Sequence, residues 1–144
     1  MATLERAIEI AARAHAGQVD KGGHPYILHP LRLMQRLEAK SERIAAVLHD
    51  VVEDTPWTLE QLRAEGFSED VLQALDALAK RPGESRMEAA SRAVIHPIAR
   101  AVKLADVADN MDLSRLPNPT PADYARVEVY KNVQVLLLAG PPEG

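Results

Sequence analysis

The sequence contains no cysteine among its 144 residues, and this absence narrows the chemistry open to the protein. Disulfide bonds, thiolate nucleophiles and cysteine-ligated zinc sites are all excluded, because each of them requires a sulfur donor. Any metal site must therefore be built from histidine and carboxylate side chains. The available donors are 5 histidines and 21 aspartate and glutamate residues.

Long apolar runs and a surplus of positive charge are also missing. No run approaches the roughly 18 to 20 residues that a membrane-spanning helix needs. The N-terminal segment has an acidic residue early and lacks the apolar core of a signal peptide. We therefore expect a cytoplasmic protein without a membrane partner. The formal net charge is −4, so the chain does not attract phosphates in bulk, and we expect no nucleic-acid partner.

Length and composition fit a single globular domain. A chain of 144 residues is large enough to bury a core and too short for two comfortable domains. Apolar residues make up 47% and charged residues 26%, unlike the composition of a disordered chain. We predict one domain over residues 1–140 and a frayed, proline-rich tail over 141–144.

Apolar residues recur at helical spacing through most of the chain, and runs long enough for a sheet are missing. We predict an all-α fold, a bundle of seven to eight helices. The expected helices cover about 4–15, 31–37, 41–54, a short segment after Thr58, a segment from Ser68 to before Pro82, 85–95, 97–112 and 121–138. Ser41 is the expected N-cap of the third helix. Pro30 is expected to force His29 into an extended conformation just ahead of the second.

The third predicted helix combines a buried pattern with ionisable side chains. Its apolar residues lie nearly all round the helix, as in a buried helix. It also carries four ionisable residues, His49, Asp50, Glu53 and Asp54. Residues three and four apart share a face, so these groups crowd one stripe, which is unfavourable unless a cation neutralises them or some carboxylates are protonated. A divalent metal is the simplest resolution, and a solvated acidic cluster at the helix end is the alternative.

A further acid, Asp106, is embedded in an apolar helical segment. Asn110 shares its helix face at a spacing of four residues. On this evidence, a place in the metal site and a surface ion pair with Lys103 are both open for Asp106.

Several motifs follow one another along the chain in a specific order. They are AHAGQ at 14–18, PYILHP at 25–30, LHDVVEDT at 48–55 and KLAD at 103–106, with Asn110-Met111 after them. This order resembles the hydrolase domain of the RelA/SpoT family and its small alarmone hydrolases, over most of the chain. An isolated His-Asp dipeptide would mean little, whereas separated motifs with compatible spacing are specific.

The resemblance implies a helical HD fold that holds one Mn(II) ion through two histidines and two aspartates. By motif, the ligands are His29, His49, Asp50 and Asp106. It also implies that Glu53 and Asp54 are catalytic. A site of nitrogen and oxygen donors suits Mn(II) but also accepts Fe, Co, Ni, Zn or Mg.

The reaction implied by the resemblance removes pyrophosphate from the ribose 3′ position of guanosine tetra- or pentaphosphate. The cation would lower the pKa of a water and polarise a phosphoryl oxygen. Glu53 and Asp54, one helical turn beyond the histidine and aspartate, would orient that water and handle protons. By motif, the substrate-binding residues are Lys21, Tyr26 and Asn110.

Two segments differ from the family pattern. The family loop Arg-Lys-Ser-Gly-Glu-Pro-Tyr reads DKGGHPY at 20–26, and the family segment Arg-Leu-His-Asn-Met-Arg-Thr reads VADNMDL at 107–113. A pyrophosphate needs cations around it, and Lys21 is the one that the motifs place in the pocket.

Two alternative functions therefore stay open. One is a phosphohydrolase of another nucleotide, such as a nucleoside monophosphate or a phosphorylated dinucleotide cofactor. The other is a catalytically silent sensor that binds a metal and a nucleotide. The presence of Glu53 and Asp54 argues against the silent sensor, because binding alone needs neither.

Other polar residues favour structural roles. His15 falls on the apolar face of the first helix, which predicts core packing. His96 is interpreted as a connector before Pro97, and Lys80 and Arg86 as members of a solvated charged turn. The last helix carries apolar residues that fit either the core or a self-association face, so a homo-oligomer stays open. These residues are Val129, Val133, Leu136 and Leu137.

Overall fold

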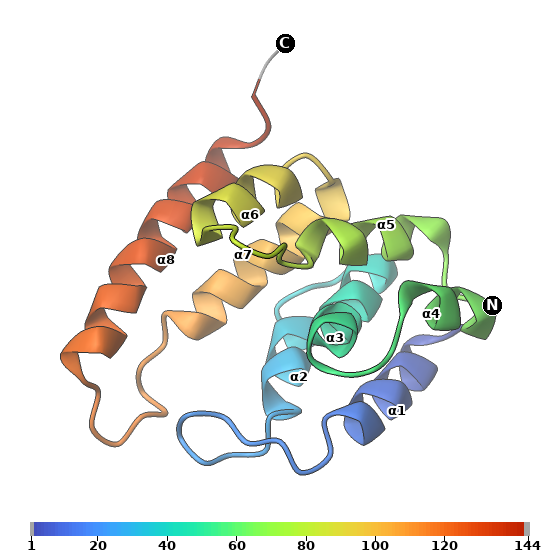
Figure 1. Ribbon diagram of the computed structural model, residues 1–144, viewed down its shortest axis with the longest axis horizontal. Coiled ribbons are helices and arrows are strands. Elements are labelled where there is room, and N and C mark those ends of the chain that lie inside the picture. The colour runs from blue at the N-terminus through green and yellow to red at the C-terminus, as the bar shows by residue number, and fades with distance from the viewer. Residues whose placement is uncertain (1, 143–144) are drawn as a thin grey trace.

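The computed structural model describes residues 2–142, and its secondary structure is helical (Figure 1). The helices are α1 (Leu4–Ala14), α2 (Leu28–Gln35), α3 (Lys40–Asp54), α4 (Leu59–Glu65), α5 (Glu69–Leu78), α6 (Arg86–Ala93), α7 (Pro97–Asn110) and α8 (Pro121–Ala139). Residues 2–142 form no strand, only an isolated bridge between Val19 and Pro25. The all-α prediction is confirmed. The last two residues of the predicted tail, Glu143 and Gly144, lie outside the described residues.

Side-chain caps explain where several helices begin. The residue ahead of each of these helices accepts a hydrogen bond from the backbone N–H three residues later, which satisfies one of the free donors of the first turn. The capping residues are Thr3, Thr58, Ser68, Ser85, His96 and Thr120. His96 is therefore more than a connector, because its Nδ1 accepts from the N–H of Ala99 at 3.4 Å.

The predicted start of the second helix was wrong. α2 begins at Leu28, so His29 lies inside its first turn and is not extended. The N–H of His29 donates to the carbonyl of Tyr26 at 3.0 Å. Pro30 is tolerated because it is the third helical residue, where a backbone N–H would have no acceptor within the helix.

The predicted cap of the third helix was also wrong. α3 begins at Lys40, with Ala39 in the N-cap position and no side-chain cap. The extended backbone of Ala39 and the bond from the N–H of Arg43 to its carbonyl, at 2.9 Å, already start the helix. Ser41 therefore lies within the first turn, so its hydroxyl does not cap the helix.

α3 is the central helix of the fold. It packs against α1, α2, α5 and α7, which surround it in Figure 1. Its middle residues are buried, as the apolar pattern predicted, and they are Ile44, Ala45, Ala46, Val47, Leu48 and Val51. A helix held on so many sides has little freedom to turn, so the polar residues of its last two turns are fixed in direction.

A second apolar cluster joins α6, α7 and α8. Within it Val133 and Leu137 are fully buried, so these two residues of the last helix belong to the core. Val129 is 39% exposed and Leu138 is 62% exposed, and self-association through this face stays a prediction. Although α8 is 19 residues long, no helix within residues 2–142 is both long and apolar enough to span a bilayer.

Candidate metal centre

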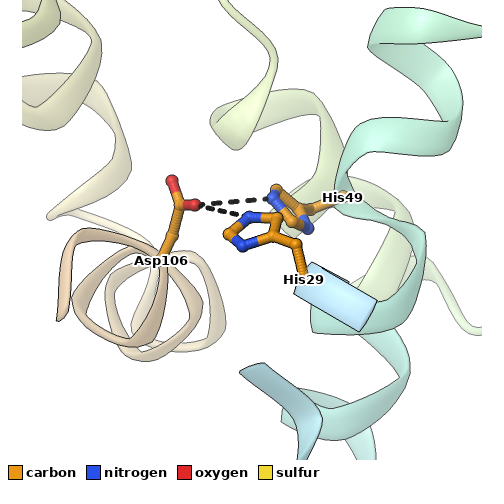
Figure 2. Close-up of side chains that lie close together, drawn as sticks. All are labelled: His29, His49 and Asp106. Atoms are coloured by element: carbon orange, nitrogen blue, oxygen red, sulfur yellow. Dashed lines mark hydrogen bonds and ion pairs between the residues drawn. The ribbon is translucent and has the colours of Figure 1, made fainter. Parts of the chain in front are cut away.

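Three helices bring two histidines and an aspartate together (Figure 2). His29 comes from α2, His49 from α3 and Asp106 from α7, and all three are buried. The Nε2 atom of His29 lies 3.0 Å from Oδ1 of Asp106, and that of His49 lies 3.8 Å from the same oxygen. One donor atom from each residue falls within 4.8 Å of the others. The first and last of the predicted ligands, far apart in sequence, are therefore neighbours.

Asp50 faces the same centre from the side of α3. Its Oδ2 lies 3.1 Å from Nε2 of His49 and 4.0 Å from Nε2 of His29. The same oxygen accepts a hydrogen bond from the hydroxyl of Tyr26. The structure thus brings all four predicted ligands to one place, and Tyr26 orients one of them.

The remaining nitrogen of each histidine is tied to an oxygen acceptor. Nδ1–H of His49 donates to the carbonyl of Ala46 at 2.7 Å, and Nδ1–H of His29 donates to Oδ2 of Asp109 at 2.7 Å. Both rings therefore turn Nε2 toward the centre. Asp109 was missed by the sequence reasoning, although it is an acid one turn after Asp106 in a mostly apolar helix, which is a readable signal.

Neighbours on α7 fix the carboxylate of Asp106. Lys103 donates to Oδ2 at 3.1 Å, and the side-chain amide of Asn110 donates to Oδ1 at 3.0 Å. The ion pair with Lys103 therefore exists, but its aspartate is 8% exposed and not at the surface. The two readings of Asp106 are compatible, because the carboxylate pairs with Lys103 through one oxygen and faces the histidines through the other.

The charges of the centre shift its pKa values strongly. Burial lowers the pKa of His49, but the neighbouring Asp50 and Asp106 carboxylates outweigh burial and raise it to about 9. Burial likewise opposes a charged His29, while hydrogen bonds to Asp106 and Asp109 raise its pKa. Burial raises the pKa of Asp106, and Lys103 and the two histidines overcome this and lower it. Protons on the imidazoles thus balance the buried carboxylates when no other cation does.

The two predicted catalytic acids lie at the end of α3. Glu53 and Asp54 are both exposed, and neither forms a hydrogen bond or ion pair within residues 2–142. Partial burial, followed by repulsion from Asp50, raises the pKa of each. A raised pKa suits a carboxyl group that accepts or donates a proton near neutral pH.

A cavity of about 490 Å³ opens beside these residues. Its wall includes His29, Asp50, Glu53 and Asp106, together with seven basic residues. The basic residues are Lys21, Lys80, Lys103, Arg32, Arg86, Arg115 and Arg126. The same wall also carries seven carboxylates, and five of the basic residues form ion pairs with them. The pocket therefore holds more cations than the motifs alone indicated, but acidic residues balance them in number.

Two of these cations have no carboxylate partner among residues 2–142. They are Lys80, just after α5, and Arg86, the first residue of α6. The guanidinium of Arg86 lies over the ring of Tyr130, 4.8 Å from its centroid. The charged turn that the sequence indicated is exposed, but it also borders the cavity.

The loop between α1 and α2 positions Lys21 and Tyr26. Oδ1 of Asp20 accepts hydrogen bonds from the N–H groups of Gly22 and His24, both at 2.9 Å, so this acid shapes the turn. A Cβ atom on Gly22 would lie 2.9 Å from the carbonyl oxygen of Arg115, so only glycine permits this approach to the segment after α7. Lys21 is exposed at the cavity wall, with Nζ 4.0 Å from Asp123.

His15 supports Tyr26 from behind. Its side chain is 2% exposed, as core packing predicted, and its ring centroid lies 5.0 Å from that of Tyr26. Its Nδ1 lies 2.8 Å from Oε1 of Gln18. The tyrosine that orients Asp50 is therefore itself packed against a buried ring.

The sequence profile of the HD domain matches residues 7–109, which span every residue of the centre. The chain belongs to the HD-domain family. This chain is similar in sequence or structure to three further proteins. It is 34% identical to a probable GTP pyrophosphokinase of Mycobacterium leprae over 140 residues, or 88% of this chain and 18% of that protein. It is 44% identical to the guanosine-3′,5′-bis(diphosphate) 3′-pyrophosphohydrolase of Haemophilus influenzae over 75 residues, or 49% of this chain and 11% of that protein.

The third similar protein has a solved structure. It is a metazoan ortholog of SpoT that hydrolyzes ppGpp, with a TM-score of 0.79 and 25% sequence identity. The match covers 97% of this chain and 87% of that chain. The proteins from Mycobacterium leprae and Haemophilus influenzae are much longer than this chain. The matched region covers 18% of the first and 11% of the second.

The donor set of this HD domain fits a divalent cation. Two imidazole nitrogens and the oxygens of two carboxylates converge, and the chain has no sulfur donor from cysteine. Both imidazoles have their other nitrogen tied to an oxygen, which is the usual arrangement around histidine ligands. Divalent metals such as Mn, Fe and Zn accept this combination of ligands.

The neighbouring carboxylates raise the pKa of His29 and raise that of His49 to about 9, so we expect metal binding to release protons from these rings. We predict that the apparent affinity for Mn(II) rises with pH up to about 9, the pKa of His49. The slope should be about tenfold per pH unit for each proton released. Mn(II) titrations at constant ionic strength between neutral pH and pH 9 measure it, with proton release followed in parallel.

The His96→Asn variant is the control for this experiment. Asparagine keeps the cap of α7, and the residue is outside the centre, so the pH dependence should not change. An affinity for Mn(II) that is independent of pH would contradict the protonated state of the two buried histidines.

Proposed function

We propose that this HD domain is a divalent-metal-dependent phosphohydrolase that acts on guanosine 3′,5′-bis(diphosphate). It removes pyrophosphate from the ribose 3′ position, with Mn(II) as the working metal and the cytoplasm as its compartment. The observation that carries the proposal is the convergence of His29, His49 and Asp106 beside a cavity whose wall includes two cations without a carboxylate partner in the described chain, Lys80 and Arg86. The similar proteins support the choice of substrate by the activities for which they are named.

The proposed ligands are His29, His49, Asp50 and Asp106. A divalent cation held there lowers the pKa of a water and polarises a phosphoryl oxygen of the substrate. Tyr26 holds Asp50 through its hydroxyl, and Asn110 and Lys103 hold Asp106. The ligand carboxylates are therefore preorganised, and this lowers the reorganisation that binding and reaction require.

The proton transfers fall to the end of α3. Glu53 lines the cavity, and its carboxylate accepts a proton from the water that attacks the phosphorus next to the 3′ oxygen. As the bond from that phosphorus to the 3′ oxygen breaks, the leaving oxygen takes up a proton. We assign the delivery of that proton to Asp54, which follows Glu53 at the end of α3 but is not among the residues that line the cavity. The products are guanosine 5′-diphosphate and pyrophosphate. Partial burial and repulsion from Asp50 raise the pKa of both groups above its ordinary value, which favours their exchange of protons.

The cavity has the size for a nucleotide, and two of its cations are available for phosphate groups. Its volume of about 490 Å³ falls in the usual range for small-molecule sites. The 3′-pyrophosphate belongs at the histidine cluster, near Lys21. Lys80 and Arg86, without carboxylate partners in the described chain, are placed to bind the 5′-diphosphate on another part of the wall.

A second candidate is a related hydrolase of another nucleotide. The observation in its favour is Asp20, because the family that this sequence resembles has an arginine at that position. The Asp20 carboxylate accepts hydrogen bonds from the backbone of its own turn. The candidate substrates are a nucleoside monophosphate and a phosphorylated dinucleotide cofactor. A substrate panel separates the two candidates directly.

The first experiment measures pyrophosphate and phosphate release from such a panel, with metal-depleted protein and with Mn(II) restored. We predict activity only with metal, and the highest kcat/KM for guanosine 3′,5′-bis(diphosphate). The Glu53→Gln variant should keep its metal but lose about 10²- to 10⁴-fold in kcat, because it cannot accept the proton. The Glu60→Gln variant, on the exposed face of α4, is the matched control and should retain the activity. Absence of metal-dependent release from every nucleotide would remove the proposal.

The second experiment tests the cationic wall. In the Arg86→Ala variant we expect KM for guanosine 3′,5′-bis(diphosphate) to rise about tenfold with kcat nearly unchanged, because a charge-assisted contact is lost. The difference from the native protein should shrink at high salt.

Arg13→Ala removes an exposed arginine of α1 outside the cavity wall and is the control. If Arg86→Ala and Arg13→Ala gave the same KM as the native protein, the 5′-diphosphate would have to bind elsewhere.

A further inference from the structure

Asp109 is the most deeply buried carboxylate near the metal centre. It lies in the last turn of α7 with 1% of its surface exposed. His29 sits between two aspartates of this helix, because Nε2 faces Asp106 at 3.0 Å and Nδ1 faces Asp109 at 2.7 Å. One ring is thus contacted on both edges by acids three residues apart. Asp106 belongs to the proposed ligands, whereas Asp109 has no assigned role.

Two arginines hold the Asp109 carboxylate in place. Arg32, one turn after His29 on α2, donates from Nε to Oδ1 at 2.8 Å and from Nη2 to Oδ2 at 3.0 Å. Arg115 lies 3.5 Å from Oδ2 and also donates to the backbone carbonyl of Asp109 at 3.0 Å. A carboxylate engaged by such a fork is an acceptor only, so the atom facing it on His29 must carry the proton.

We propose that Asp109 is a positioning residue that keeps His29 in the Nδ1–H tautomer and aims its Nε2 lone pair at the metal. In the neutral ring one nitrogen carries hydrogen and the other the lone pair, so fixing the first assigns the second. The charged acceptor also makes the ring a better electron donor. The proposal rests on the metal site of the proposed function, but it does not depend on which nucleotide is hydrolysed.

The two histidines differ in how their tautomers are fixed. His49 donates from Nδ1 to a neutral backbone carbonyl within its own helix, that of Ala46. His29 depends on a charged side chain from another helix. A change at Asp109 therefore affects one ligand and leaves the other unchanged, which makes the role separable by mutation.

A purely structural role for Asp109 is the competing explanation. The fork between Arg32 and Asp109 joins α2 to α7, and its loss would lower stability whether or not a metal binds. The distinguishing quantities are metal affinity and the position of the proton on His29. A structural ion pair alone changes neither of them.

The test compares Mn(II) affinity in the native protein and in the Asp109→Asn variant. We expect the variant to bind Mn(II) about 10- to 100-fold more weakly, the usual effect of removing an outer partner of a histidine ligand. The matched control is Glu65→Gln, which breaks an equivalent fork with Arg6 between α4 and α1. An Asp109→Asn affinity within about twofold of the native value, with the control also unchanged, would overturn the proposal.

A second measurement needs no variant. Nitrogen-15 NMR of the metal-free native protein, at a pH where His29 is neutral, reports which ring nitrogen carries hydrogen. The proposal predicts hydrogen on Nδ1, and hydrogen on Nε2 would overturn it even if Asp109→Asn failed to fold. Tight Mn(II) binding without nucleotide hydrolysis would remove the proposed function and leave this role of Asp109 intact. If the native protein hydrolysed the nucleotide but Asp109→Asn bound Mn(II) with unchanged affinity, the proposed function would stand and the proposed role of Asp109 would fall.

Discussion

Compensation of buried negative charge where α2, α3 and α7 meet is the constraint on which the rest of the structure depends. Asp50, Asp106 and Asp109 lie there with little access to water. Unpaired, such charges would cost several kcal/mol each. The same carboxylates raise the pKa of His29 and of His49, so protonated imidazoles are favoured there when no metal is bound. A divalent cation replaces those protons with charge located between the same side chains.

Helix packing and hydrogen bonds fix the positions of these charged side chains. α3 is enclosed by four neighbouring helices, so His49 and Asp50 approach from a fixed direction. α2 and α7 supply His29 and Asp106, and hydrogen bonds between them continue outward to Arg32 and Arg115. The centre is therefore connected by contacts to the cavity wall. The proposed metal ligands and part of the cavity wall therefore belong to one hydrogen-bonded network.

Most of the helices and the metal cluster were readable from the sequence, for identifiable reasons. The apolar pattern of α3 predicted its burial, and the acids beside His49 indicated a cation, although Glu53 and Asp54 prove to be exposed. His29 and Asp106 were placed in the centre by the resemblance to a family and not by any local pattern. The conformation of His29 was predicted wrongly, because the rule for residues before proline is a preference that the first turn of α2 overrides.

Other parts of the site depend on packing that no local pattern records. Lys80 and Arg86 reach the cavity only because the turn between α5 and α6 folds over toward α8. The sequence alone shows that this turn is charged but not that it borders a cavity. Asp109 was visible as an acid in an apolar helix, but its partner His29 is 80 residues away, so the pairing required the tertiary structure.

The most direct test of the account is a crystal structure of the protein grown with Mn(II), with anomalous diffraction data collected to locate the metal. The account predicts a single strong anomalous peak about 2 Å from Nε2 of His29, Nε2 of His49 and an oxygen of Asp106. A saturated crystal without a peak at that position, or with these three side chains turned away from a metal bound elsewhere, would contradict it.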